Sequence, residues 1–186
     1  VSGSCLAALA ILAHGHGADA RHVLELGAGR GLLGLGAALL GYTGEVTDLE
    51  PEICDALRES LRETRDRGTT LDLNVRCLDW DDGLDEAMHR LGPKGLLLGA
   101  ELLWADDAVE ALLDAVLPAV VDHAWTFIYG AALRPSNDIF MKSLAAVSGT
   151  SLSCHNCLVE THCGNCHGIQ SREETNVLLW SPAAAS

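Results

Sequence analysis

The chain has 186 residues, of which 48% are hydrophobic and 20% are charged. That length fits one ordinary domain with a substantial buried core, and the composition excludes an intrinsically disordered chain. The 12 Lys and Arg residues against 26 Asp and Glu residues give a formal net charge of −14. This charge argues against a nucleic-acid partner, because phosphate binding needs concentrated positive charge.

The sequence predicts no membrane span. The apolar run Cys5–Ala13 has nine residues, far fewer than the ~20 that a bilayer requires, and it is read as an amphipathic first helix. The chain begins at Val1 rather than Met, so we expect residues upstream to be missing. Seven Cys is an odd number, which argues against a disulfide framework and favours the reducing cytoplasm, with the nucleus as the alternative.

Short apolar runs alternate with helical patterns along most of the chain. The five predicted strands of this part are His22–Leu26, Glu45–Asp48, Asn74–Leu78, Leu96–Leu103 and Trp125–Gly130. The helices predicted after them are Gly31–Leu40, a helix from Pro51 that ends before Gly68, a short helix over Asp85–Leu91 after a turn at Asp79–Gly83, a helix from Asp106 that Pro118 ends or kinks, and a helix that Ser136 caps and that runs to about Val147. Two further strands, Thr150–Glu160 and Thr175–Ser181, follow without a helix between them. We therefore expect a single domain over residues 1–186, with an α/β, Rossmann-like, doubly wound and mostly parallel seven-stranded sheet that ends in an antiparallel hairpin.

A glycine-rich turn, Glu25–Gly31, follows the first predicted strand. Glycine at alternate positions lets a ligand lie against bare backbone, in front of the N–H groups of the next helix. A dinucleotide motif in this register would need glycine where the chain has Leu32, and a glycine set that starts two residues later lies too far into the turn. The Glu25 carboxylate suits a ligand with an ammonium group, such as S-adenosylmethionine, better than it suits a pyrophosphate.

Acidic and aromatic residues follow the next two strands. Asp48 lies 21 residues after Gly27, a spacing at which a carboxylate accepts ribose hydroxyls. Glu50 is the alternative, although it is favoured as the cap of the following helix. Trp80 offers a flat face to an adenine and Asp79 an acceptor for its amine, but a core Trp beside a turn Asp explains the pair equally well.

Glu101 and Trp104 follow the fourth strand, at the edge of the sheet where such folds bind ligands. A carboxylate three residues before an aromatic ring suits the orientation of an incoming amine within a narrow channel. A helix-capping acid and a packing Trp are the alternative.

These motifs resemble those of the class I, seven-strand methyltransferases, and within them the methyltransferase-like protein-lysine methyltransferase group. The segments that carry the resemblance are Val23–Gly34, Val46–Asp48, Leu78–Trp80 and Leu98–Trp104. The resemblance covers nearly the whole chain.

The resemblance implies roles for the site residues. Gly27, Ala28 and Gly29 would contact the methionine end of the cofactor, and Ala100 would present its backbone near the sulfonium. Asp48 would bind the ribose, and Trp80 would lie beside the adenine. Glu101 and Trp104 stand where this group usually has Asp and Tyr.

The sequence therefore predicts transfer of a methyl group from S-adenosylmethionine to a protein side chain, with lysine as the favoured acceptor. A substrate segment with basic residues would complement the net charge. The alternative is a weak or inactive S-adenosylmethionine-binding module that acts through a protein partner. A nicotinamide-dependent oxidoreductase is a third interpretation, which Glu25 and Leu32 disfavour.

The tail contains two Cys-x-x-Cys pairs, Cys154 with Cys157 and Cys163 with Cys166. Only five residues separate the pairs, fewer than the ~12–20 that are common in zinc sites. We expect a cysteine-rich hairpin loop and no metal, with zinc as the alternative. The histidines at positions 89 and 123 are expected to be ordinary surface or loop residues.

Overall fold

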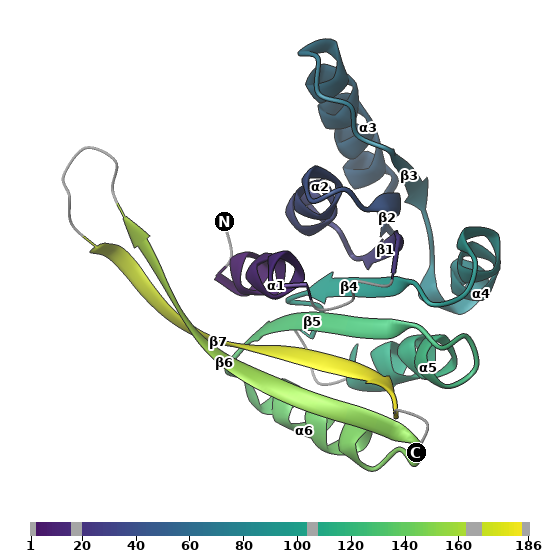
Figure 1. Cartoon of the computed structure of the whole chain (residues 1–186), viewed down its shortest axis with the longest axis vertical. Helices are drawn as coiled ribbons and strands as arrows, with labels where there is room; N and C mark the ends of the chain where they lie inside the picture. Colours follow the sequence, from purple (N-terminus) through teal and green to yellow (C-terminus); the bar gives the residue numbers. More distant parts are fainter. Residues whose placement is uncertain (1–2, 16–19, 104–107, 163–168, 184–186) are drawn as a thin grey trace.

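The computed structural model describes residues 3–15, 20–103, 108–162 and 169–183. The strands are β1 (His22–Leu26), β2 (Thr43–Asp48), β3 (Leu73–Cys77), β4 (Leu96–Ala100), β5 (Thr126–Ala132), β6 (Thr150–His162) and β7 (Ile169–Pro182). They form one sheet in the order β3-β2-β1-β4-β5-β7-β6 (Figure 1). The first five strands of that order are parallel, and β7 pairs antiparallel with both β5 and β6. The predicted architecture is confirmed.

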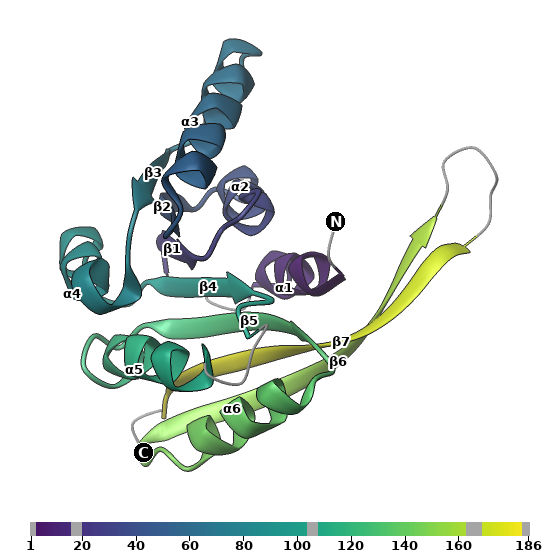
Figure 2. The same ribbon diagram turned by 180° about the vertical axis from the view of Figure 1, so that it is seen from behind.

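Within the described residues, six helices cover the two faces of the sheet. They are α1 (Gly3–Ala13), α2 (Leu32–Leu39), α3 (Pro51–Asp66), α4 (Trp80–Leu91), α5 (Ala108–Val121) and α6 (Pro135–Ala145). Buried side chains of α1, α2 and α3 form one core cluster with the sheet, and those of α4, α5 and α6 form the other (Figures 1 and 2). Neighbouring strand residues alternate between the two clusters, so the sheet is buried on both sides, as expected for a mostly parallel sheet.

The fourth helix begins earlier than predicted. Asp79 caps it, since the Asp79 carboxylate accepts a hydrogen bond from the Asp81 N–H at 3.2 Å. The polar residues read as a turn are therefore its first helical turn, where Asp81 and Asp82 also suit the positive end of the helix dipole.

Other predicted boundaries were wrong for identifiable reasons. Pro118 lies inside α5, which continues to Val121, so the proline does not end the helix; Ala119 and Val120, the two residues after it, are fully buried. Ser136 does not cap α6; its hydroxyl donates to the Leu103 carbonyl at 3.3 Å, and the helix begins at Pro135. The fourth strand ends at Ala100 rather than three residues later.

The first helix is apolar around its whole circumference rather than amphipathic. It buries Ala7, Ala8 and Leu12 against the sheet, yet it leaves Leu6 37% exposed. The predicted start of the fifth helix, at Asp106, lies outside the described residues. Within the described ranges, no helix combines the length and the hydrophobicity that a bilayer crossing needs.

Candidate active site

A cavity of about 380 Å³ opens where β1, β2 and β4 end and α4 begins. Its lining residues are Gly27, Asp48, Leu49, Glu50, Leu78, Asp79, Trp80, Glu101, Leu102 and Ala108. Five of the predicted site residues, at positions 27, 48, 79, 80 and 101, therefore line the same cavity. The position is the one at which open α/β sheets bind ligands.

The glycine turn presents bare backbone to this cavity. Gly27 and Gly29 have φ values of 54° and 52°, in the left-handed region that favours glycine. A Cβ atom on Gly27 would lie 2.7 Å from the Leu102 side chain, whereas nothing lies within 4 Å of one built on Gly29. Ala28 does not line the cavity, and its N–H donates to the Thr47 carbonyl at 2.8 Å.

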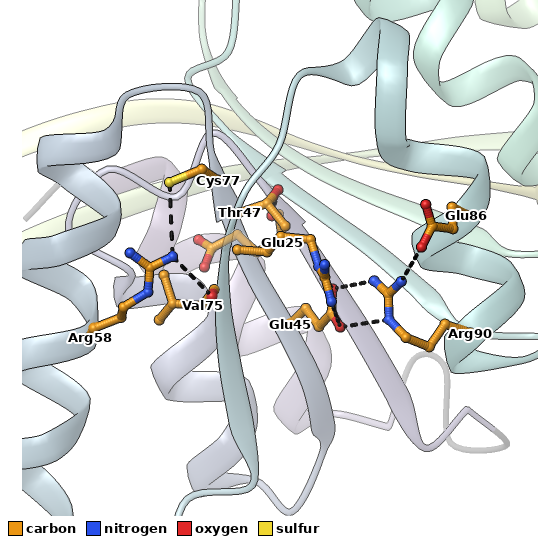
Figure 3. Close-up of polar contacts among 9 residues, drawn as sticks. Glu25, Glu45, Thr47, Arg58, Val75, Cys77, Glu86 and Arg90 are labelled. Atoms are coloured by element: carbon orange, nitrogen blue, oxygen red, sulfur yellow. Dashed lines mark hydrogen bonds and ion pairs between the residues drawn. The ribbon is translucent and has the colours of Figure 1, made fainter.

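Glu25 does not line the cavity, and its side chain lies against α2. It is 3% exposed, and its carboxylate accepts a hydrogen bond from the Gly34 N–H at 2.9 Å. Burial raises the pKa of Glu25 to about 8, although the bond from Gly34 opposes that rise. The Glu25 carboxylate thus binds one of the N-terminal N–H groups of α2, which the sequence predicts to face a ligand. The contact of Glu25 with an ammonium group stays a prediction. Figure 3 shows Glu25 beside Thr47, whose hydroxyl donates to the Glu25 carbonyl at 2.7 Å.

Two ion pairs that the sequence did not indicate join Glu45 of β2 to Arg76 of β3 and to Arg90 of α4. Figure 3 shows Glu45 and Arg90. Glu45 of β2 is 4% exposed and accepts hydrogen bonds from Arg76 at 3.1 Å and from Arg90 at 2.9 Å. Burial alone would raise the pKa of Glu45, but the bonds from the two guanidinium groups outweigh it and hold that pKa below its ordinary value. These two ion pairs connect β2 with β3 and with α4.

Asp48 is held at the end of β2 with both carboxylate oxygens in use. One oxygen accepts from the Gly29 N–H at 2.9 Å, and the other accepts from the Glu50 N–H at 3.2 Å. Each oxygen keeps a lone pair, so the carboxylate remains able to accept hydroxyl groups from the cavity side. Glu50 occupies the N-cap position of α3, but its side chain makes no capping hydrogen bond, contrary to the expectation.

Glu101 follows β4 in a strained backbone conformation, with φ of 57°. One carboxylate oxygen accepts from the Ser4 hydroxyl of α1 and from the Ala132 N–H, the latter at 2.8 Å. The other oxygen pairs with the Arg134 guanidinium at 3.1 Å. Groups from α1, from the end of β5 and from the connection before α6 therefore fix this side chain, which is 23% exposed.

A buried polar network holds the segment that carries Glu101. The Tyr129 hydroxyl accepts from the Leu103 N–H at 3.2 Å and donates to the Asn137 side-chain carbonyl at 3.1 Å. The Asn137 amide in turn donates to the Ala132 carbonyl at 2.6 Å. Burial raises the pKa of Tyr129 above its ordinary value, which keeps the hydroxyl a donor. No local sequence pattern indicated this network.

The last two predicted site residues do not contribute to the described cavity lining. Ala100 ends β4 beside Gly130 of β5 and does not line the cavity. Trp104 lies outside the described residues.

The tail cysteines fall partly in β6. Cys154 is exposed, whereas Cys157 is half-buried and packs against the core cluster that includes α1. Residues three apart in a strand point to opposite faces, so these two thiols do not converge on one ion as a zinc knuckle requires. Cys163 and Cys166 lie outside the described residues.

The charge of the cavity limits the ligands that fit it. Four of the described lining residues (Asp48, Glu50, Asp79 and Glu101) are acidic, and none of them is basic. A phosphate group would meet repulsion here, whereas a nucleoside with a positively charged sulfur and an ammonium group would be attracted. The bare glycine turn, the Asp48 carboxylate and the Trp80 ring fit such a nucleoside.

Comparison with solved structures shows that the chain has the fold of known methyltransferases. The chain is similar to precorrin-6y C5,15-methyltransferase from Geobacter metallireducens GS-15, with a TM-score of 0.69, 13% identity and coverage of 96% of this chain and 86% of the other. It is also similar to magnesium protoporphyrin IX methyltransferase from Synechocystis PCC 6803, with a TM-score of 0.66, 15% identity and coverage of 97% and 78%. At this identity the likeness shows the fold alone.

Sequence comparison identifies the family. Residues 5–147 match the family model described as lysine methyltransferase, and the chain belongs to that family. It is 35% identical over 96 residues to the protein N-lysine methyltransferase METTL21A of Danio rerio, a match that spans 52% of this chain and 43% of that protein. The corresponding protein of Xenopus tropicalis is 33% identical over 95 residues, which span 51% and 42%. The matches thus cover less than half of these relatives.

Proposed function

We propose that this chain transfers a methyl group from S-adenosylmethionine to the side-chain amine of a lysine in a protein. The observation that carries the proposal is the acidic, glycine-floored cavity at the end of the parallel strands, without a basic residue among its described lining. Membership of the lysine methyltransferase family supports the same reaction. The net charge of −14 supports a substrate segment with basic residues. The odd number of Cys residues supports the cytoplasm, with the nucleus as the alternative.

Three residues of the cavity would hold the cofactor. The Gly27 backbone would lie under its amino-acid end, Asp48 would accept its ribose hydroxyls, and the Trp80 ring would cover its adenine. When bound, S-adenosylmethionine supplies an electrophilic methyl group on a positively charged sulfur. Ala28, Gly29, Asp79 and Ala100 contribute the turn, the helix cap and the strand end that shape this space.

Glu101 is the residue that we place nearest to the substrate amine. Its carboxylate already accepts from three donors, so it is suited to orient the amine rather than to remove a proton from it. Arg134 is 45% exposed and shares one carboxylate oxygen, and an incoming ammonium group would compete with it for that oxygen. Positioning of this kind supplies much of the acceleration of a methyl transfer. Free lysine has a pKa of about 10.4, so desolvation in the closed site must favour the neutral, nucleophilic form.

The test uses labelled S-adenosylmethionine and a protein extract. We expect labelled protein bands, and acid hydrolysis of those bands should release labelled N-methyllysine. The same extract with its lysines chemically acetylated should accept no label, and Glu101→Gln should lower the incorporation.

Two outcomes would contradict the proposal. Label in another amino acid would show another acceptor. Saturable cofactor binding without transfer to any protein would indicate the inactive binding module instead.

A further inference from the structure

Two histidines and an aspartate that the proposed methyl transfer does not use converge on the outer side of α4. Asp85 and His89 lie one turn apart on that helix, and His123 comes from the connection between α5 and β5. His123 Nε2 lies 2.7 Å from one Asp85 carboxylate oxygen, and His89 Nδ1 lies 3.3 Å from the other. One potential ligand atom from each of the three residues lies within 4.8 Å of the other two.

We propose that these three residues form a binding site for a divalent transition-metal ion of the zinc type. Two imidazoles and one carboxylate are a ligand set that Zn²⁺ prefers, and three protein ligands leave a position open. Bonds of about 2.0–2.2 Å at a tetrahedral angle place neighbouring ligand atoms about 3.4 Å apart. The two measured spacings, 2.7 and 3.3 Å, lie just below that value, and all three ligand atoms lie within 4.8 Å of one another, so small side-chain rotations would bring the three groups into position.

The backbone on both sides of the cluster is fixed in advance. The His123 N–H donates to the Pro118 carbonyl at 3.1 Å, which closes the end of α5. Two residues further on, Trp125 is fully buried and its ring N–H donates to the Gly92 carbonyl at 3.1 Å, just past the end of α4. A metal ion would therefore bind between two anchored segments, and little ordering entropy opposes it.

The side chains of the three residues already contact one another. The His89 and His123 rings meet edge to face, with centroids 4.7 Å apart. His123 is 19% exposed, whereas Asp85 and His89 are 70% and 65% exposed, so the open coordination position faces solvent. In the structure a proton on His123 Nε2 bridges to Asp85, because a carboxylate oxygen only accepts. The metal ion would replace that proton.

The surroundings favour a cation. Asp85 lies at the rim of a hollow of about 480 Å³ between α4 and α5, which is also lined by Asp81, Asp82, Glu86 and Asp114. Their negative potential raises the local concentration of divalent ions without supplying the geometry of a site. The geometry comes from the two imidazoles, which distinguish a zinc-type ion from Mg²⁺ or Ca²⁺.

The experiment titrates the purified chain with ZnCl₂ by calorimetry and with CoCl₂ by visible absorption. We expect a component of one equivalent whose cobalt spectrum lacks a thiolate charge-transfer band. His123→Ala and His89→Ala should each weaken that component about tenfold or more. The matched control is His14→Ala, which removes an exposed histidine just after the end of α1 and should leave the component unchanged.

A second readout is thermal unfolding. Zn²⁺ should raise the unfolding temperature of the unmodified chain and of His14→Ala, but not that of the other two variants, because the ion links α4 to the segment after α5. The proposal is overturned if no thiolate-free component exists, or if that component survives in both His89→Ala and His123→Ala. Circular dichroism of each variant establishes that it is folded.

Discussion

Substitution of Glu101 separates its structural role from its chemical one. In Glu101→Ala, the Ala132 N–H loses its acceptor, whereas the buried Ser4 hydroxyl keeps the Thr175 hydroxyl at 2.9 Å as an alternative partner. An unsatisfied buried donor costs about 1–3 kcal/mol, and the half-exposed ion pair with Arg134 adds less than about 1 kcal/mol. We expect the free energy of unfolding to fall by roughly 1–4 kcal/mol. Glu101→Gly should lose about 1 kcal/mol less, because glycine relieves the left-handed backbone.

Glu101→Gln is the matched variant. Both hydrogen bonds from Ser4 and Ala132 go to the same carboxylate oxygen, which the amide oxygen of glutamine replaces. Stability should therefore change by about 1 kcal/mol or less, since only the Arg134 pair is lost. Methyl transfer should nevertheless fall about tenfold or more, because a neutral amide holds an ammonium group poorly.

Urea unfolding followed by circular dichroism measures the first quantity, and incorporation of labelled methyl groups measures the second. Equal stability of the Ala and Gln variants would refute the assigned hydrogen-bond network. Full transfer activity in Glu101→Gln would refute the role of the carboxylate in orienting the amine.

Three further predictions concern the buried groups around the cavity. Glu25 binds a proton more tightly in the folded chain, because its pKa is about 8 there and 4.5 when the group is unperturbed. The free energy of unfolding should therefore fall by up to about 1.4 kcal/mol per pH unit as the pH rises between these two values. Urea unfolding of Glu25→Gln should lack that fall. Asp48→Ala should weaken S-adenosylmethionine binding, measured by calorimetry, about tenfold or more. The control Asp55→Ala, which removes an exposed carboxylate of α3, should leave the affinity unchanged. Equal losses of affinity in the two variants would assign the effect to net charge. Tyr129→Phe leaves a buried amide and a side-chain carbonyl without partners and should cost about 1–3 kcal/mol in urea unfolding, so an unchanged midpoint would contradict the network.

The strands and the approximate location of the site were predictable from local patterns. Buried parallel strands are continuous apolar runs, as in Leu96–Leu98, and the glycine turn marks where the first of them ends. Strand ends of a parallel sheet meet at one edge, which is why Asp48, Trp80 and Glu101 were expected together, and the cavity confirms that they line one space.

The partners of the site residues were not predictable, because they come from distant parts of the chain. The hydroxyl that bonds Glu101 belongs to Ser4, 97 residues earlier, and the sequence gives no periodic signal for such a pair. Glu25 illustrates a different limit. Its charge suggested a ligand, but burial and a backbone donor nine residues later decide where the side chain points. The misread start of α4 has a third cause, since Asp and Gly favour both turns and helix caps.

A crystal structure of the chain with S-adenosylhomocysteine, the demethylated form of the cofactor, tests the central claim most directly. We expect the nucleoside in the 380 Å³ cavity, with its ribose on Asp48, its adenine beside Trp80 and its amino-acid end over the Gly27 backbone. Crystals grown at saturating concentration with the nucleoside bound elsewhere, or with this cavity filled by protein side chains, would contradict the account.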